Sequence, residues 1–105
     1  MAMAQDVRQT IKTRLQNDYS FRFALLSEAM EGLLGGDVET AKRVLWDYID
    51  ATIGFAELAV RSGLPVRSLR RMFTPQGDPR ASEMFKVIAA LQKHQGVQLE
   101  VGVAA

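Results

Sequence analysis

The chain has 105 residues, a formal net charge of +1, 48% apolar residues and no cysteine. This length suits one domain, 1–105, that buries a core without help from a metal or a disulfide. The lack of cysteine excludes disulfides and thiolate metal sites. Apolar stretches are short and interrupted by charges, and the first residues lack the pattern of a secretory signal. We therefore expect a cytoplasmic protein that makes no membrane contact.

Charge is distributed unevenly between the two halves of the chain. From Asp18 to Glu57 there are eight acidic and three basic residues, whereas from Leu58 to Ala105 there are seven basic and three acidic residues. Phosphate would therefore be attracted to the C-terminal half. Such charge differences between the halves of a chain also occur in proteins that bind no nucleic acid. The charge distribution alone therefore does not indicate DNA binding.

The first half of the chain predicts three helices, which form a helical scaffold over 1–53. The first covers 6–16, where apolar residues recur at spacings of four. The second begins at a cap on Asp18 or Ser20 and ends at Gly35-Gly36. The third runs from a cap at Asp37 to about Ala51. The core side of the second helix is expected to carry Phe21, Leu25, Leu26, Ala29, Met30, Leu33 and Leu34.

A second region, 54–94, follows the scaffold and predicts three more helices. Two short helices over 55–62 and 66–73 are separated by Gly63-Leu64-Pro65, a sequence typical of a turn. After a turn-rich loop, a last helix covers 80–94. Its inward residues are expected to be Met84, Phe85, Ile88 and Leu91. The fold class is therefore all-α, with five to six helices.

Apolar and polar residues alternate from Val97 to Val101, which predicts a short C-terminal β-strand over 97–101. A lone strand cannot satisfy its own backbone and needs a partner edge. The simplest partner is the same strand of a second copy, so we expect a homodimer in which Val97, Leu99 and Val101 lie at the interface. The alternative is a tail that folds back on its own chain or frays.

The short helices over 55–62 and 66–73 have the features of a helix-turn-helix. The first helix needs a small residue where the second crosses it, and the turn needs a glycine four residues later. Ala59 and Gly63 meet these requirements. The residues expected to pack inward are Leu58, Leu64, Leu69 and Met72, which leaves Val66, Arg67, Ser68, Arg70 and Arg71 facing outward.

The pattern Leu58-Ala59-x3-Gly63-Leu64-x4-Leu69-x2-Met72 resembles the helix-turn-helix of the phage-repressor (XRE or Cro/CI) family. The following Pro79-x4-Met84-x2-Val87-Ile88-x2-Leu91 is also similar to that family. The resemblance extends over about Gly54 to Leu91. It implies an XRE-type helix-turn-helix and sequence-specific binding to double-stranded DNA.

A narrower resemblance is to HigA-like addiction-module antidote proteins. It is carried by Asp50-Ala51-Thr52-Ile53-Gly54-Phe55-x-Glu57-Leu58-Ala59, Ser68-Leu69-x-Arg71-Met72, Gly77-Asp78-Pro79 and Gly96-Val97-x-Leu99-Glu100-Val101. This resemblance implies an antitoxin that neutralises a HigB/RelE-like toxin and represses its own operon.

The resemblance also implies roles for single residues. The helix over 66–73 would lie in the major groove, with Val66, Arg67 and Arg71 at base edges. Ser68 and Arg70 would contact phosphate or the groove wall. Further phosphate contacts are expected at Thr74, Gln76 and Arg80. The chain departs from the family at Gly54-Phe55, where many members carry Thr-Gln with the glutamine on the DNA backbone, and at Pro65, which replaces a capping serine or threonine.

No catalytic or metal constellation is evident, so we expect neither an enzyme nor a cofactor. The single histidine, His94, lies near the end of the last helix, where a solvated side chain is usual. Glu28 and Glu31 share a helix face without a histidine to complete a metal site. The alternative to a DNA-binding regulator is a helical protein-interaction module that binds a toxin or another partner. In that module Trp46, among the acidic helices, is either an anchor or part of the core.

Overall fold

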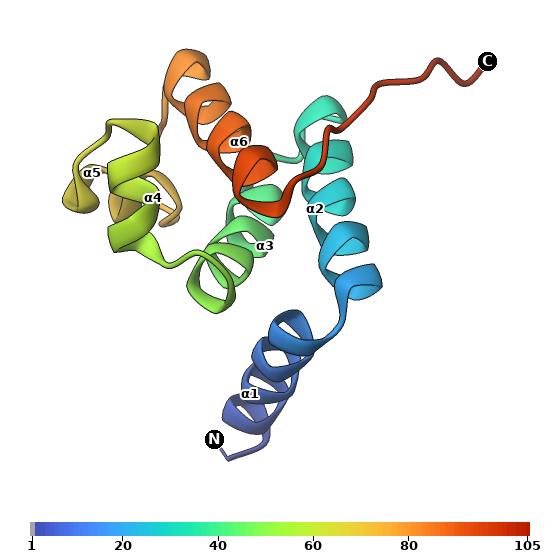
Figure 1. Cartoon of the computed structure of the whole chain (residues 1–105), viewed down its shortest axis with the longest axis vertical. Helices are drawn as coiled ribbons and strands as arrows, with labels where there is room; N and C mark the ends of the chain where they lie inside the picture. Colours follow the sequence, from blue (N-terminus) through green and yellow to red (C-terminus); the bar gives the residue numbers. More distant parts are fainter. Residues whose placement is uncertain (1) are drawn as a thin grey trace.

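The computed structural model describes residues 2–105, with side chains described from Asp6 onward. These residues form six α-helices and no strand (Figure 1). The helices are α1 (Ala2–Asn17), α2 (Tyr19–Leu34), α3 (Val38–Ala51), α4 (Phe55–Ser62), α5 (Val66–Met72) and α6 (Ala81–Gln95). The all-α class is therefore confirmed. The first helix begins four residues earlier than its apolar periodicity suggested, since Ala2–Gln5 are good helix formers without an apolar pattern.

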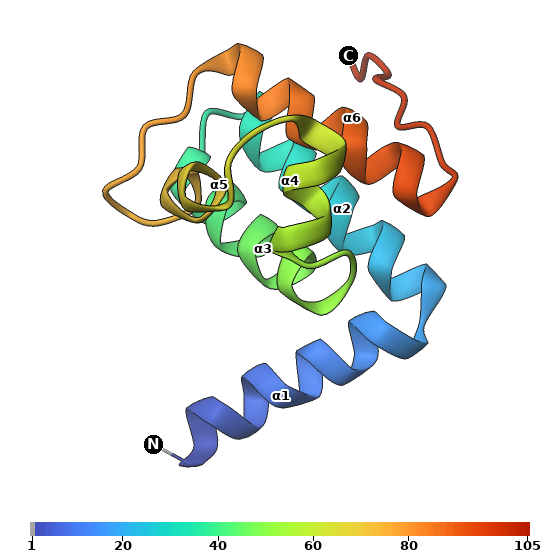
Figure 2. The same cartoon turned by 60° about the vertical axis from the view of Figure 1, so that its left-hand side comes forward.

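Carboxylate caps begin both α2 and α3. The Asp18 side chain accepts a hydrogen bond from the Phe21 backbone N–H at 3.0 Å, and Asp37 accepts one from the Thr40 N–H at 3.3 Å. Asp18, rather than Ser20, is thus the cap of α2. Between the helices, Gly36 adopts a φ of 84°, which glycine reaches without strain. The short connection lets α2 and α3 pack side by side in opposite directions (Figure 2).

Helix α1 extends from one end of the molecule (Figures 1 and 2). Two ion pairs join it to α3, Arg8–Asp47 at 3.2 Å and Lys12–Asp50 at 3.6 Å. Arg22 of α2 secures its C-terminal end by donating to the carbonyl oxygens of Leu15 and Gln16. Such bonds satisfy helix-end carbonyls that have no partner within the helix.

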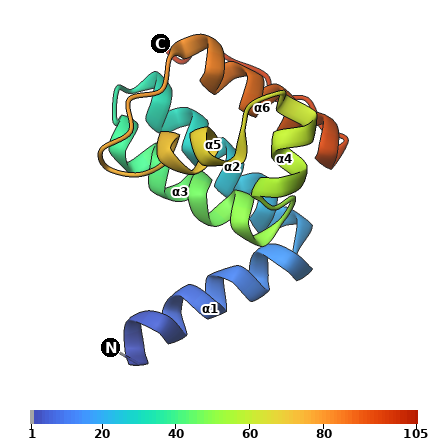
Figure 3. The ribbon, with the colours of Figure 1, turned by 90° about the vertical axis from the view of Figure 1, so that its left-hand side faces the viewer.

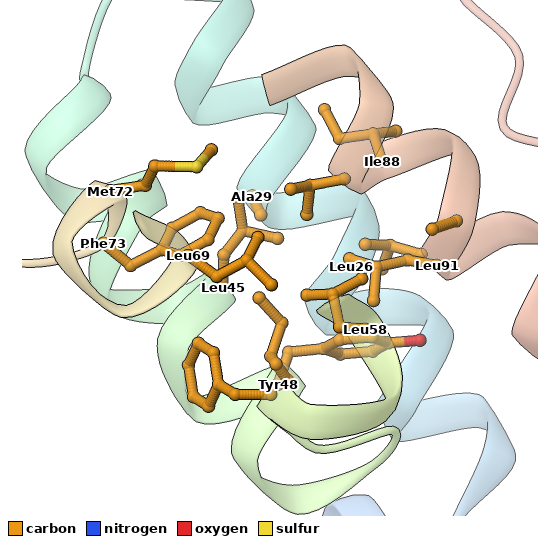
Figure 4. Packing of buried hydrophobic residues seen from close by; sticks show 14 of the residues in the cluster. Leu26, Ala29, Leu45, Tyr48, Leu58, Leu69, Met72, Phe73, Ile88 and Leu91 are labelled. Atoms are coloured by element: carbon orange, nitrogen blue, oxygen red, sulfur yellow. The ribbon is translucent and has the colours of Figure 1, made fainter. Parts of the chain in front are cut away.

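One hydrophobic core draws on all six helices. Figure 4 shows side chains of α2 to α6 converging on this core, around Leu26, Leu45, Leu58, Leu69 and Leu91. Leu15 of α1 is also fully buried. The largest fully buried side chain is Tyr48, whose hydroxyl has no hydrogen-bond partner among the described residues. Burial raises the pKa of Tyr48 to about 12.

Two side chains expected in the core are exposed, so these predictions were wrong. Leu34 is 67% exposed because it is the last residue of α2, beside the Gly35 turn. Phe85 is 62% exposed. The buried stripe of α6 runs through Met84, Val87, Ile88 and Leu91. Phe85 lies about 100° around the helix from Met84, outside that stripe.

The chain after α6 has no regular secondary structure. The backbone N–H of Val97 donates to the Gln92 carbonyl, and that of Leu99 donates to the Gln92 side chain at 2.7 Å. Leu99 is half-buried against the core, whereas Val101 is 76% exposed. The tail therefore folds back as far as Leu99. The strand expected over 97–101 is not formed in the single chain, and its pairing with a second copy stays a prediction.

Candidate nucleic-acid interface

A tight turn fixes the relation between α4 and α5. Gly63 ends α4 in the left-handed conformation, with φ 76°, and its N–H donates to the Ala59 carbonyl at 3.0 Å. The Ser62 hydroxyl accepts from the Leu64 N–H at 3.2 Å. Pro65 then precedes the first residue of α5, where a missing donor does no harm. As a result the two helix axes point in clearly different directions (Figure 2).

Only one side of α5 faces the core. Leu69 and Met72 are buried, and Phe73 directly after the helix is buried as well (Figure 4). Leu58 of α4 lies in the same cluster, and Leu64 of the turn is half-buried against it. The packing of Leu58, Leu64, Leu69 and Met72 against the core is thus confirmed. Figure 3 views the molecule from the side on which no other helix lies in front of α5.

The outer side of α5 is rich in unpaired positive charge. Arg67, Arg70 and Arg71 are exposed, and Val66 is 37% exposed. None of these three arginines forms an ion pair with a carboxylate among the described residues. In contrast, Arg61 of α4 pairs with Glu57 at 3.0 Å. Ser68, expected to face outward, is half-buried, which leaves it less available than the arginines.

Arg70 differs from its neighbours because an aromatic side chain lies beneath it. Its guanidinium carbon is 5.2 Å from the centre of the Phe55 ring, a cation–π geometry. Phe55 is buried, and its ring lies 4.7 Å from that of Trp46. Trp46 is half-buried at the edge of the core, so its position lies between that of a core residue and that of an exposed anchor. Arg70 is thereby drawn toward the start of α4, while Arg67 and Arg71 have no such contact among the described aromatic rings.

The loop after α5 contains the remaining expected site residues. Gln76 and Arg80 are exposed. The hydroxyl of Thr74 already donates to the Arg71 carbonyl at 2.8 Å, so Thr74 is the least available of the three. At the start of α6 the Glu83 carboxylate accepts from the Arg80 backbone N–H at 3.0 Å. This carboxylate would repel a phosphate from the helix end, so the Arg80 side chain, rather than the backbone, is the donor available there.

A buried lysine, which the sequence analysis missed, holds this loop in place. Lys42 of α3 is 2% exposed, and its ammonium group has three acceptors. Its Nζ donates to the backbone carbonyls of Thr74 at 2.9 Å and Gly77 at 2.8 Å, and pairs with Glu39 at 3.0 Å. A lysine ammonium has three N–H donors, so all are satisfied. Sequence alone gave no signal for this role because the acceptors lie 32 and 35 residues away.

Gly77 permits the loop to lie directly against the end of α5. A Cβ atom at this position would be 1.9 Å from the Arg71 carbonyl oxygen and 2.9 Å from that of Met72. The Gly77 N–H donates to the Thr74 carbonyl at 3.0 Å, which closes a four-residue turn with Pro75 in its second position. The loop is therefore fixed both to α5 and, through Lys42, to α3.

A groove of about 420 Å³ is lined in part by Gly77, Asp78 and Pro79 of this loop. Apolar side chains of α2, α3 and α6 line it, among them Leu33, Val38, Met84 and the exposed Phe85. Lys42 and Gly77 also contribute to its wall. The groove therefore adjoins the loop that follows α5.

The described residues contain no group of three or more His, Asp or Glu residues placed to hold a metal ion. None of the described helices is long and apolar enough to cross a membrane. Burial lowers the pKa of His94, and the positive charge of Arg61 lowers it further. The His94 ring lies 2.9 Å from the side-chain nitrogen of Gln95.

A comparison of the chain with protein-family models, curated proteins and solved structures finds no match.

Proposed function

We propose that this protein is a sequence-specific DNA-binding transcriptional regulator that inserts α5 into the major groove. The observation that carries the proposal is the exposed side of α5, where Arg67 and Arg71 have neither an ion-pair partner nor an aromatic contact among the described residues. A guanidinium fork can bond guanine O6 and N7 together, and Val66 offers an apolar contact to a thymine methyl group.

Phosphate contacts next to α5 would fix its register on the duplex. Arg70, in the last turn of α5, lies over Phe55 at the start of α4, and Gln76 and Arg80 follow the C-terminal end of α5. Arg70 is thus available for the backbone contact that Phe55 cannot make. Ser68 and Thr74 contribute less in this proposal because they are half-buried.

We further propose that two copies bind together through the C-terminal segment Val97–Val101. In a strand, the N–H groups of alternate residues point to the same edge. Gln92 already accepts from Val97 and Leu99, so the edge carrying the N–H groups of Gln98 and Glu100 is left for a second copy. A dimer would present two α5 helices to two half-sites, which offsets the weakness of a single short helix.

The resemblance to XRE-type and HigA-like proteins gives this regulator a biological setting, that of an antitoxin repressing its own operon. A HigB/RelE-like toxin would then be a second partner. The second candidate function, a protein-interaction module without DNA binding, is favoured by one observation, the apolar groove beside the 62% exposed Phe85. Exposed apolar surface of this kind often marks a protein contact.

Titration of a fluorescent duplex from the region upstream of the protein's own gene separates the two functions. A regulator should bind this duplex more tightly than a shuffled duplex of equal composition, and should release it as salt rises. Equal affinity for both duplexes, or no binding, would favour the interaction module. In that case Phe85→Ser should abolish partner capture.

A further inference from the structure

We propose that Lys42, although it is buried and cannot touch DNA, is a positioning residue for the phosphate contacts of the loop after α5. This inference rests on the DNA binding proposed above and names a residue that the binding depends on. The starting observation is the ammonium group's set of three partners, Thr74, Gly77 and Glu39, at 2.8–3.0 Å.

The two carbonyl partners are the first and last residues of one turn. Thr74 and Gly77 are joined by the Gly77 N–H bond to the Thr74 carbonyl at 3.0 Å. Lys42 therefore binds both ends of the turn at once and ties it to α3. Gln76 lies inside the turn and Arg80 three residues after it, so the anchored turn sets where both exposed side chains stand.

The same turn is in contact with the end of α5. Gly77 leaves no space for even a methyl group beside the Arg71 carbonyl, and the Thr74 hydroxyl donates to that same carbonyl at 2.8 Å. A shift of the turn must therefore move Gln76 and Arg80 relative to α5. Lys42, on another helix, thus fixes the distance between the phosphate contacts of the loop and the base contacts of α5.

Only a compact cation suits this site. Lysine carries a point-like ammonium with three donors, and the three acceptors converge on it. Methionine has a similar apolar stem and no donors, so Lys42→Met removes the anchor while filling much of the same space. Exposed Lys86 of α6, which has no ion pair among the described residues, provides the matched control Lys86→Met.

The test measures affinity for the upstream duplex at several salt concentrations, with folded protein verified by circular dichroism. We expect Lys42→Met to weaken binding about tenfold and to lower the slope of log affinity against log salt by about one, as if a phosphate contact were lost. A variant that is only less stable would show a smaller folded fraction with an unchanged slope. Lys86→Met should leave the slope closer to that of the wild type.

Removing both exposed side chains sharpens the result. If Lys42 acts through Gln76 and Arg80, the triple variant Lys42→Met/Gln76→Ala/Arg80→Ala should bind about as well as Gln76→Ala/Arg80→Ala. Multiplying effects, or a folded Lys42→Met variant with wild-type slope, would overturn the inference and leave DNA binding intact. A wild-type chain that binds no duplex would overturn both.

Should Lys42→Met fail to fold, Glu39→Ala answers the same question, because the Glu39 side chain is 66% exposed. Loss of a negative charge would by itself strengthen attraction to DNA. The positioning role instead predicts weaker binding by Glu39→Ala, and equal or tighter binding would overturn it.

Discussion

The ammonium of Lys42 donates to the carbonyl oxygen of Gly77 at 2.8 Å, across 35 residues of sequence. This bond joins the N-terminal helices to the loop that follows α5. The position of the loop in the candidate interface therefore depends on the helical scaffold, although the sequence predicts a boundary between these two regions at about residue 53.

Gly77→Ala should destabilise the protein, by about 1–3 kcal/mol. The added Cβ would be 1.9 Å from the Arg71 carbonyl oxygen, and neither backbone can yield while Lys42 holds the turn. Urea unfolding followed by circular dichroism measures the effect. Gly102→Ala is the control, since nothing lies within 4 Å of that position. Equal unfolding midpoints for the two variants would contradict this view of the loop.

Tyr48→Phe should leave stability unchanged or raise it by about 1 kcal/mol. The Tyr48 hydroxyl is buried without a hydrogen-bond partner among the described residues, and such a group carries an uncompensated desolvation cost. The substitution keeps the ring in the core and removes only that oxygen. Thermal unfolding of the variant provides the measurement, and a loss of more than about 1 kcal/mol would show that the hydroxyl has a partner in solution.

The free energy of unfolding should decrease as the pH falls below about 6.5, the usual pKa of histidine. His94 should contribute to that decrease. Its pKa is lowered by burial first and then by Arg61 and Arg22, with Glu57 acting in the opposite direction. The folded chain therefore binds fewer protons than the unfolded chain between the lowered pKa and about 6.5. The contribution of His94 to the free energy of unfolding is fully present above about pH 6.5 and is lost as the pH decreases through its lowered pKa.

The comparison of wild type with His94→Gln isolates this contribution. Urea midpoints measured at about pH 7.5 and about pH 5.5 should differ less in the variant than in the wild type, because glutamine does not titrate. An identical pH dependence in both proteins would mean that His94 does not resist protonation in the folded state.

Val101→Asp should convert a dimer to a monomer without affecting the fold. Val101 is 76% exposed in the single chain, so the substitution cannot disturb its core, whereas in a dimer paired through 97–101 it would place a charge at a position expected to lie in the interface. Sedimentation at micromolar concentration gives the oligomeric state. Val103→Asp lies outside the predicted strand and serves as the control. A wild-type chain that sediments as a monomer would rule out the strand-paired dimer.

Local signals in the sequence were sufficient for most of the helical architecture. The caps at Asp18 and Asp37 and the left-handed glycine at Gly63 act within a few residues, so they can be recognised without knowledge of the fold. The inward residues Leu58, Leu69 and Met72 follow from helical spacing in the same way.

The errors arose where distant parts of the chain decide the outcome. The apolar character of Phe85 predicts a core position, but the packing of α6 places the buried stripe elsewhere. No local pattern indicates the role of Lys42, because its carbonyl partners belong to a loop more than thirty residues away. The backbone N–H of Leu99 donates to the Gln92 side chain of its own chain. The alternation of apolar and polar residues cannot reveal such a bond.

The most direct measurement is the affinity of Arg67→Ala and Arg71→Ala for the upstream duplex, compared with that of Lys93→Ala. Lys93 is an exposed lysine in the last turn of α6, away from α5. If α5 reads bases, each arginine variant should lose about 1–3 kcal/mol on the upstream duplex and much less on a shuffled duplex. Arginine variants that bind both duplexes as well as Lys93→Ala would contradict the placement of α5 in the major groove.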